Sequence, residues 1–443
     1  MSAPKSDPHP MSEIERRTIA KVTARTIPIL LLAFIVSYID RVNVGFAGIT
    51  ANRDLGLSPE MYGFGAGLAL LSYSLFELPS NLAMEKFGAR RWLARIMITW
   101  GLVGCSMVLV NGPMTFYLVR FLLGAAEAGL FPGVILHLTY WFPKRHRSRA
   151  LSLFAIGIPL ASVIGSPVSG AIMEMDGFLG FKGWHWLYVL EALPAVILGV
   201  MVLVFLTDRP HQAKWLNEEE KTWLQGELDR EKAGHNEARH RFAWKMLGDS
   251  RVLVLAAVFF LTGVPSYGLS FWLPLAIKAT GLTTLQTGFV TALPFAFGCV
   301  AMIYWGRRSD QKRERVWHTF AGAALAFVGL VCGAWATDPL VQLAAICVSA
   351  VGIYCIKGPF LAIISEALSG GNAAAGIALV STLGSLSGFA APWMVGKIRG
   401  MTDGYQWALI ALGVQSLLGG LLLLAWAHNR RLKLAATPLP VEP

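Results

Sequence analysis

Charged residues are scarce in this chain. Only 15% of its 443 residues are Asp, Glu, Lys or Arg, whereas 55% are hydrophobic. A soluble protein of this length carries more charge, so the composition excludes that class. The apolar residues form about twelve separate runs of span length, which indicates a helical membrane protein that crosses the bilayer many times. Strands of a membrane β-barrel would alternate in polarity, so that class is excluded as well.

Residue patterns typical of reactive or metal-binding sites are also missing. The five cysteines all lie within the apolar runs and lack the spacing of metal ligands, so we expect no disulfide framework and no metal site. We find no nucleophile–base pair, ligand cluster or phosphate-binding loop, and therefore expect neither enzyme activity nor a cofactor. The polar first 26 residues do not resemble a cleavable signal peptide.

The apolar runs fall into two sets of six, separated by one long hydrophilic insert. We therefore expect an all-α membrane protein with a cytoplasmic tail (1–25), an N-terminal six-helix bundle (26–206), a cytoplasmic linker (207–250), a C-terminal six-helix bundle (251–428) and a second tail (429–443). Within the linker, the stretch that follows Trp215 has apolar residues near helical spacing and predicts a short surface helix. The expected spans are 26–50, 61–84, 92–110, 113–141, 149–173, 184–206, 251–276, 285–305, 317–336, 339–366, 372–397 and 405–428.

The net charge of +11 is unevenly distributed along the chain. If both termini are cytoplasmic, 30 of the 38 Lys and Arg residues fall in cytoplasmic segments and only five in outer loops. This bias predicts the orientation of the spans and makes a nucleic-acid partner unnecessary. Lys397 and Arg399, which fall close together on one outer loop, are a local exception to the bias.

The two halves carry related loop sequences. The segment 81–91 between the second and third spans, and the segment 306–313 between the eighth and ninth, begin 225 residues apart. The first spans of the halves, at 26 and 251, differ by the same number. A duplicated six-span unit with a binding site at the interface is a known plan for transporters.

Four charged residues lie within the first and fourth spans. Arg120 and Glu127 are seven residues apart, nearly two helical turns, so they share one face about 10 Å apart along the axis. Asp40 and Arg41 are adjacent and point about 100° apart, so each needs another partner, and Arg120 and Glu127 are the candidates. Charges at this depth are typical of substrate or proton pathways, although a purely structural network is the alternative.

A further cation, Lys357, lies within the tenth span. It is followed by Gly358 and Pro359, which predict an interruption of the helix. Broken helices at membrane depth are typical of cavity linings, and a cation from each half would suit a substrate with two carboxylates. Partial extension of the lysine toward the membrane surface is the alternative.

Several motifs resemble those of the major facilitator superfamily. The turn from Glu85 to Arg91, repeated from Gly306 to Asp310, is similar to the loop signature of that family. The stretches 38–44 and 120–133, and the Tyr-Trp-Phe-Pro sequence at 140–143 followed by basic residues, resemble its anion:cation symporter family, in particular the tartrate, phthalate and hexonate branch. The resemblance covers residues from about 25 to 430 and implies a fold of two six-helix halves.

The resemblance assigns roles to individual residues. It implies that Asp40 and Glu127 are protonation sites and that Arg120 binds a substrate carboxylate. Ser381 and Ser385 stand where relatives often have asparagines, which leaves the exact substrate open. The expected substrate-binding residues are Arg120, Arg41, Lys357, Tyr73, Ser381, Ser385, Trp272 and Tyr267, although packing is the alternative role for the aromatic ones. The expected conformational-switch residues of the loops are Glu85, Arg90, Arg91, Asp310 and Arg307.

Taken with the resemblance, the residues predict a monomeric, proton-coupled symporter of a bacterial inner membrane. We expect it to import a small organic anion by alternating access, with a C4 hydroxydicarboxylate such as tartrate as the first choice. Phthalate, a hexarate or a hexonate is the alternative substrate. Uniport, export and a sensor without transport are alternative functions.

Overall fold

The computed structural model describes residues 11–233, 248–368, 373–402 and 404–436. Within these ranges the regular elements are helices and the structure contains no strand. The N-terminal half contains α1 (Glu13–Asp54), α2 (Pro59–Phe87), α3 (Ala89–Cys105), α4 (Pro113–Glu127), α5 (Leu130–Trp141), α6 (Lys144–Met173) and α7 (Gly183–Phe205). After α8 (Glu218–Ala233), the C-terminal half contains α9 (Ser250–Lys278), α10 (Thr284–Lys312), α11 (Val316–Trp335), α12 (Pro339–Ala367), α13 (Ala373–Ser385), α14 (Ser387–Thr402) and α15 (Gln406–Ala436).

Every expected span coincides with one helix or with a pair of helices. Ten segments of the described chain are long and apolar enough to cross a membrane, and α2 and α6 occupy the remaining two expected positions. The fourth span is divided into α4 and α5, and the eleventh into α13 and α14. Helix α1 begins at Glu13, inside the expected tail 1–25, so it extends the first expected span toward the N-terminus, and residues 1–10 lie outside the described part of the chain. The short surface helix predicted in the linker is present as α8.

Local sequence signals explain where several helices begin. The side chains of Ser12 and Ser58 accept hydrogen bonds from backbone N–H groups in the first turns of α1 and α2. Thr283 forms a reciprocal cap with Gln286 at the start of α10. Asp338 accepts two backbone hydrogen bonds in front of Pro339, the first residue of α12. These caps satisfy N–H groups that a helix leaves unpaired at its start.

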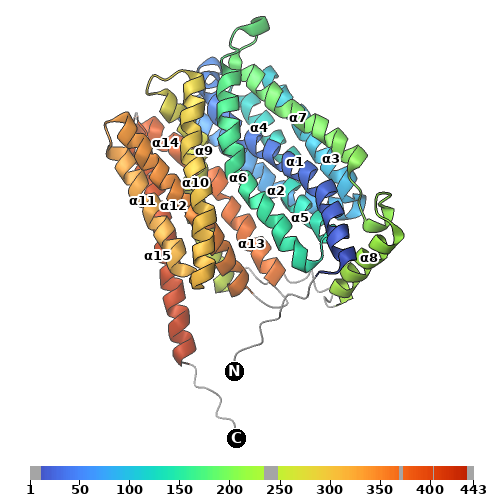
Figure 1. Cartoon of the computed structure of the whole chain (residues 1–443). Coiled ribbons are helices and arrows are strands. Elements are labelled where there is room, and N and C mark those ends of the chain that lie inside the picture. Colours follow the sequence, from blue (N-terminus) through green and yellow to red (C-terminus); the bar gives the residue numbers. More distant parts are fainter. Residues whose placement is uncertain (1–10, 234–247, 369–372, 403, 437–443) are drawn as a thin grey trace.

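The helices form one bundle in which the start of α1 and the end of α15 lie at the same end (Figure 1). We call this the terminal end and the opposite one the distal end. The linker helix α8 lies at the terminal end beside α1 (Figure 1), where Glu220 accepts hydrogen bonds from Arg17 and Lys21. Helix α8 is thereby attached to the N-terminal half.

The two halves are packed together toward the distal end. The hydroxyl of Tyr62 lies 3.0 Å from the carbonyl oxygen of Val44 and 3.1 Å from that of Phe271, so it connects α1, α2 and α9. At Gly63 the backbones of α2 and α14 approach so closely that an added Cβ would overlap the carbonyl oxygen of Pro392. Small residues permit this approach between membrane helices. The distal seam, defined by Tyr62, Gly63, Phe271 and Pro392, therefore joins the halves.

Candidate functional site

The central charge pair of the interior is formed by Arg41 on α1 and Glu127 at the end of α4. Arg41 Nε lies 2.8 Å from Glu127 Oε1, and the hydroxyl of Ser37 donates to the same oxygen over 2.5 Å. The guanidinium carbon lies 4.7 Å from the centroid of the Tyr73 ring. The Arg41 side chain is 19% exposed and that of Glu127 only 6%. The arginine is therefore the more accessible member of the pair.

A break in the fourth span places Glu127. Helix α4 ends at this residue, Ala128 is extended (ψ 131°), and Gly129 adopts a left-handed conformation with φ 89°. The hydroxyl of Ser80 donates to the freed carbonyl of Ala128 over 2.6 Å and accepts from Trp92 Nε1 at 3.0 Å. Interrupted backbone at membrane depth is tolerated where its polar groups are satisfied, and it is typical of transporter sites.

Asp40 is held by neutral partners. Asn43 Nδ2 donates to Asp40 Oδ1 over 2.9 Å, and Trp100 Nε1 donates to Oδ2 over 2.7 Å. The residue is only 2% exposed, and in the described part of the chain no cation forms an ion pair with it. Two hydrogen bonds stabilise a buried carboxyl group without fixing an arginine beside it.

Arg120, a candidate partner for Asp40, forms no ion pair with that residue in the part of the chain that the structure describes. Its Nη2 donates to the carbonyl of Ala66 over 3.1 Å and its Nε to that of Gly65 over 3.4 Å, and the residue is 2% exposed. Gly65 faces side chains of α4, so the two helices lie close together, and two backbone carbonyls of α2 accept hydrogen bonds from the guanidinium. Glu127, the other candidate partner, pairs with Arg41.

A buried carboxyl group that the sequence analysis did not select, Glu191 on α7, lies next to Asp40 and Asn43. Ser169 donates to Glu191 Oε1 over 2.6 Å, and the Asn43 side chain lies beside the same carboxyl group. Glu191 Oε2 and Asn43 Oδ1 are both buried without a hydrogen-bond partner among the described residues. A signal was present, because Glu191 is an acid within the apolar run of the sixth expected span.

Lys357 on α12 lies against an aromatic ring. Its ammonium nitrogen lies 4.6 Å from the centroid of the Tyr354 ring, and among the described residues it has no carboxylate partner. The predicted helix interruption is wrong, because α12 runs continuously from Pro339 through Gly358 and Pro359 to Ala367. A proline removes a single backbone donor, and a membrane helix packed on its neighbours can accommodate that loss.

The other expected binding residues lie in different places. Tyr73 contacts Arg41, and Tyr267 on α9 lies within electrostatic range of the same guanidinium, so both halves contribute to this region. Trp272 lies in the distal seam, where its Nε1 donates to the carbonyl of Pro392 over 3.2 Å. Ser381 and Ser385 lie on α13, just before the break at Leu386. No hydrogen bond links either serine to the charged groups above in the described chain.

The loop residues at the terminal end form contacts within each half. The Arg90 backbone N–H donates to Asp208 and its Nε to the carbonyl of Leu203, both over less than 3 Å. Asp310 pairs with Arg315, which also lies 3.5 Å from Glu366. Glu85, Arg91 and Arg307 are exposed.

The fold and the interior charges define a multi-pass membrane transporter. The chain belongs to the Major Facilitator Superfamily, whose sequence profile matches residues 30–392. The resemblance noted from the motifs is confirmed, as are the all-α fold and the assignment to transporters rather than enzymes.

Several known proteins similar to this chain are transporters from bacteria. A protein of Agrobacterium vitis with the name "Putative tartrate transporter" is 46% identical over 418 residues, covering 94% of this chain and 93% of its own. A quinolone resistance transporter of Acinetobacter baumannii is 39% identical over 408 residues, covering 92% and 94%. Among solved structures, an inward-facing bacterial homologue of the human lysosomal transporter Spinster matches with a TM-score of 0.73 and 14% identity, covering 94% of this chain and 98% of its own.

Proposed function

We propose that this protein is a proton-coupled symporter that imports a small organic anion, with a C4 hydroxydicarboxylate such as tartrate as the first choice. The pair between Arg41 and Glu127 carries the proposal, because it joins a permanent cation to an acid that can gain a proton. The name of the Agrobacterium vitis relative supports tartrate. The bacterial relatives and the charge distribution support an inner-membrane location with both termini cytoplasmic, so that the distal end faces outward.

The mechanism follows from the chemistry of the pair. A guanidinium presents a planar fork that binds a carboxylate with two hydrogen bonds. An incoming carboxylate competes with Glu127 for Arg41, the more exposed member of the pair. Glu127 then loses its cation in a buried environment, which favours binding of a proton. Anion entry and proton uptake are thereby coupled at one residue.

The remaining cations fit an anionic substrate with two charges. Lys357 has no carboxylate partner among the described residues, and it lies in the half opposite Arg41. Arg120, the arginine first expected to bind substrate, already donates to two backbone carbonyls. We therefore propose Arg41 as the main residue that binds the substrate carboxylate and Arg120 as a secondary one. The packed distal seam corresponds to the state of alternating access that is closed on the distal side.

Substrate-driven proton flux tests the proposal. Proteoliposomes that contain purified protein and a trapped pH indicator receive external tartrate without an imposed pH gradient. The wild-type protein should acidify the lumen. Glu127→Gln should abolish this signal but retain tartrate counterflow, since the amide cannot carry the proton, and Glu60→Gln at the exposed start of α2 is the control. Undiminished proton movement in Glu127→Gln would remove Glu127 from the mechanism.

Export is the second candidate function, and the quinolone resistance transporter from Acinetobacter baumannii is the observation that favours it. A thermal-shift series with tartrate, phthalate, a hexarate, gluconate and a quinolone separates the candidates, because a ligand stabilises the fold only when it binds. Stabilisation by tartrate alone supports the first proposal. Stabilisation by the quinolone and by none of the acids would replace it.

A further inference from the structure

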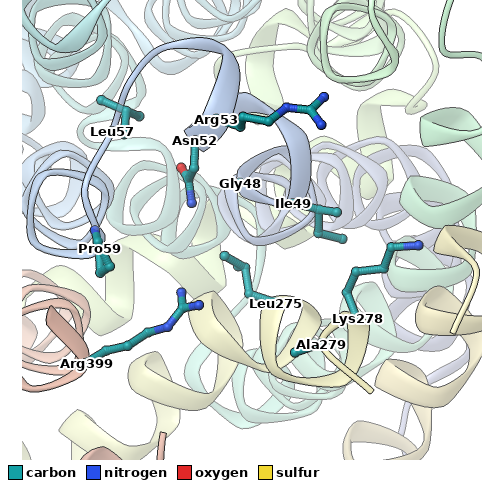
Figure 2. Close-up of a pocket in the computed structure, with 10 residues that line it drawn as sticks. All are labelled: Gly48, Ile49, Asn52, Arg53, Leu57, Pro59, Leu275, Lys278, Ala279 and Arg399. Carbon is teal, nitrogen blue, oxygen red and sulfur yellow. The ribbon is translucent and has the colours of Figure 1, made fainter. Parts of the chain in front are cut away.

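A cavity of about 360 Å³ lies at the distal end of the bundle, over the seam between the halves. Its lining comes from both halves, as Figure 2 shows: the end of α1 and the start of α2 on one side, and the ends of α9 and α14 on the other. Three of its ten lining residues are cations (Arg53, Lys278 and Arg399) and none is an acid. This cavity therefore accounts for Arg399, one of the basic residues that break the charge bias of the outer loops.

The cations differ in how far they are neutralised. Arg53 lies 3.6 Å from Asp54, at the limit of an ion pair. Lys278 donates to the backbone carbonyl of Leu282 over 2.8 Å. Arg399 lies over the rings of Tyr405 (4.5 Å) and Trp272 (5.6 Å). In the described part of the chain, neither Lys278 nor Arg399 has a carboxylate partner, so positive charge from one half accumulates beside the other.

The orientation of the side chains suits a small anion. In Figure 2 the guanidinium of Arg399 and the amide of Asn52 extend toward each other from opposite halves, with Leu275 and Gly48 beside them. A guanidinium and an amide together offer charged and neutral donors to carboxylate or sulfate oxygens. Lys278 extends away from them in Figure 2 and adds positive charge at the rim of the cavity. The volume lies in the lower part of the range for small-molecule sites.

We infer that this distal cavity is a second anion site, separate from the interior pair, which binds a small dianion and bridges the two halves when the distal end is closed. Opening the distal end moves α1 and α2 away from α9 and α14 and separates the donors. A ligand shifts an equilibrium toward the state that it binds better. A dianion in the distal cavity therefore favours the distal-closed state and slows reopening. Only the identity of the organic anion depends on the proposed function.

Calorimetric titration of the protein in lipid nanodiscs tests the site directly. Sodium sulfate and sodium tartrate are titrated separately at constant ionic strength. Arg399→Gln should weaken dianion binding to the distal cavity about tenfold or more, as expected for losing a charged hydrogen-bond donor. Lys397→Gln is the matched control, because it makes the same charge change on the same helix but does not line the cavity. It should change affinity by less than about twofold, consistent with the small effect of an exposed charge.

A second variant, Lys357→Met, distinguishes binding at the distal cavity from binding at the interior site. It should leave sulfate binding at the distal cavity unchanged even if tartrate transport is lost, so failure of the transport proposal and failure of this inference are distinguishable. Binding of tartrate alone identifies an organic-acid site, and binding of both anions identifies a general dianion site. Equal weakening by Arg399→Gln and Lys397→Gln, or no binding of either anion beyond what Lys357→Met removes, would overturn the inference.

Discussion

Some charged residues of the interior are held by several hydrogen bonds within the fold, whereas others could still bind a ligand. Arg120 donates to two carbonyls of α2, and Asp40 accepts from Asn43 and Trp100. Arg41 pairs with one carboxylate, that of Glu127, and is partly exposed. Among the groups described, the Lys357 ammonium lies over the face of a tyrosine ring and has no carboxylate partner. Because uncompensated cations are costly at membrane depth, the residues that retain this cost are the candidates for ligand binding.

Lys357 provides a test of this division. Lys357→Ala should weaken binding of a dicarboxylate about tenfold, because one of two charged contacts is lost, while a monocarboxylate changes by less than about threefold. Competition of each acid against transport of labelled tartrate measures both values. Lys312→Ala, an exposed lysine at the end of α10, is the control. Equal changes for the two classes of acid would show that Lys357 does not select the second carboxylate.

Glu191 gives a second prediction, because two buried acceptors, its Oε2 and Asn43 Oδ1, lack donors. We predict that Glu191 carries a proton and donates it to Asn43 Oδ1, so that the carboxyl group is neutral. Glu191→Gln, which also offers a donor, should change the free energy of unfolding by less than about 1 kcal/mol. Glu191→Ala, which removes the acceptor of the Ser169 hydroxyl and offers no donor to Asn43 Oδ1, should cost about 1–3 kcal/mol. Thermal unfolding in detergent measures both, and equal losses would indicate a charged carboxylate.

At the scale of elements, hydropathy predicted the spans well because a bilayer leaves no alternative to continuous apolar helices. The breaks were harder to predict. Gly358 and Pro359 suggested one and α12 is continuous, whereas Ala128 and Gly129 gave no such warning and the fourth span is interrupted there. That break depends on a hydroxyl supplied by Ser80, 48 residues away in the chain. Local sequence does not contain a partner of this kind.

The same limit explains the partly wrong account of the charges. The spacing of Arg120 and Glu127 on one helix face was read correctly, but pairing depends on which backbone lies opposite. Close approach of α2 at Gly65 supplied carbonyls to Arg120, and Arg41 on α1 reached Glu127. Glu191 was passed over because a single acid in an apolar run has no sequence partner that marks it. Tertiary contacts decide both cases.

The attachment of α8 to α1 allows a pH prediction outside the membrane. Burial opposes the change, but hydrogen bonds from Lys21, the Asn217 backbone and Arg17 lower the pKa of Glu220 from its usual 4.5 to about 2. A lowered folded-state pKa stabilises the fold fully above the ordinary pKa, and this contribution is lost as the pH falls from about 4.5 toward 2.

Removing the charge should therefore have its full effect above about pH 4.5 and a smaller effect as the pH falls toward 2. Glu220→Gln should lower stability by about 1–2 kcal/mol at pH 7, as expected for lost charged hydrogen bonds, and the difference from wild type should shrink as the pH approaches 2. Thermal unfolding at a series of pH values measures this. Glu218→Gln, whose side chain is 88% exposed, is the control and should show little effect. A difference that grows on acidification would contradict the assigned pKa.

At the scale of the whole molecule, the distal seam determines whether the two halves can close. Gly63 faces the carbonyl of Pro392 so closely that Gly63→Ala cannot form the seam as it stands, whereas opening the distal end relieves the overlap. We therefore expect Gly63→Ala to favour the distal-open state and to slow transport at least about tenfold, since closure is a required step. Thermal stability should fall by no more than about 1 kcal/mol, because the clash exists in one state only.

Labelling distinguishes this result from simple misfolding. A cysteine introduced at Leu275, which lines the distal cavity, should react faster with an external maleimide in Gly63→Ala than in the wild type. Gly400→Ala on α14 is the matched control, because an added Cβ there meets nothing within 4 Å. Sulfate should slow the labelling in the control by occupying the distal cavity and favouring closure, and it should do so less in Gly63→Ala, whose seam cannot form. A labelling rate unchanged by Gly63→Ala would mean that this seam is not the contact that opens.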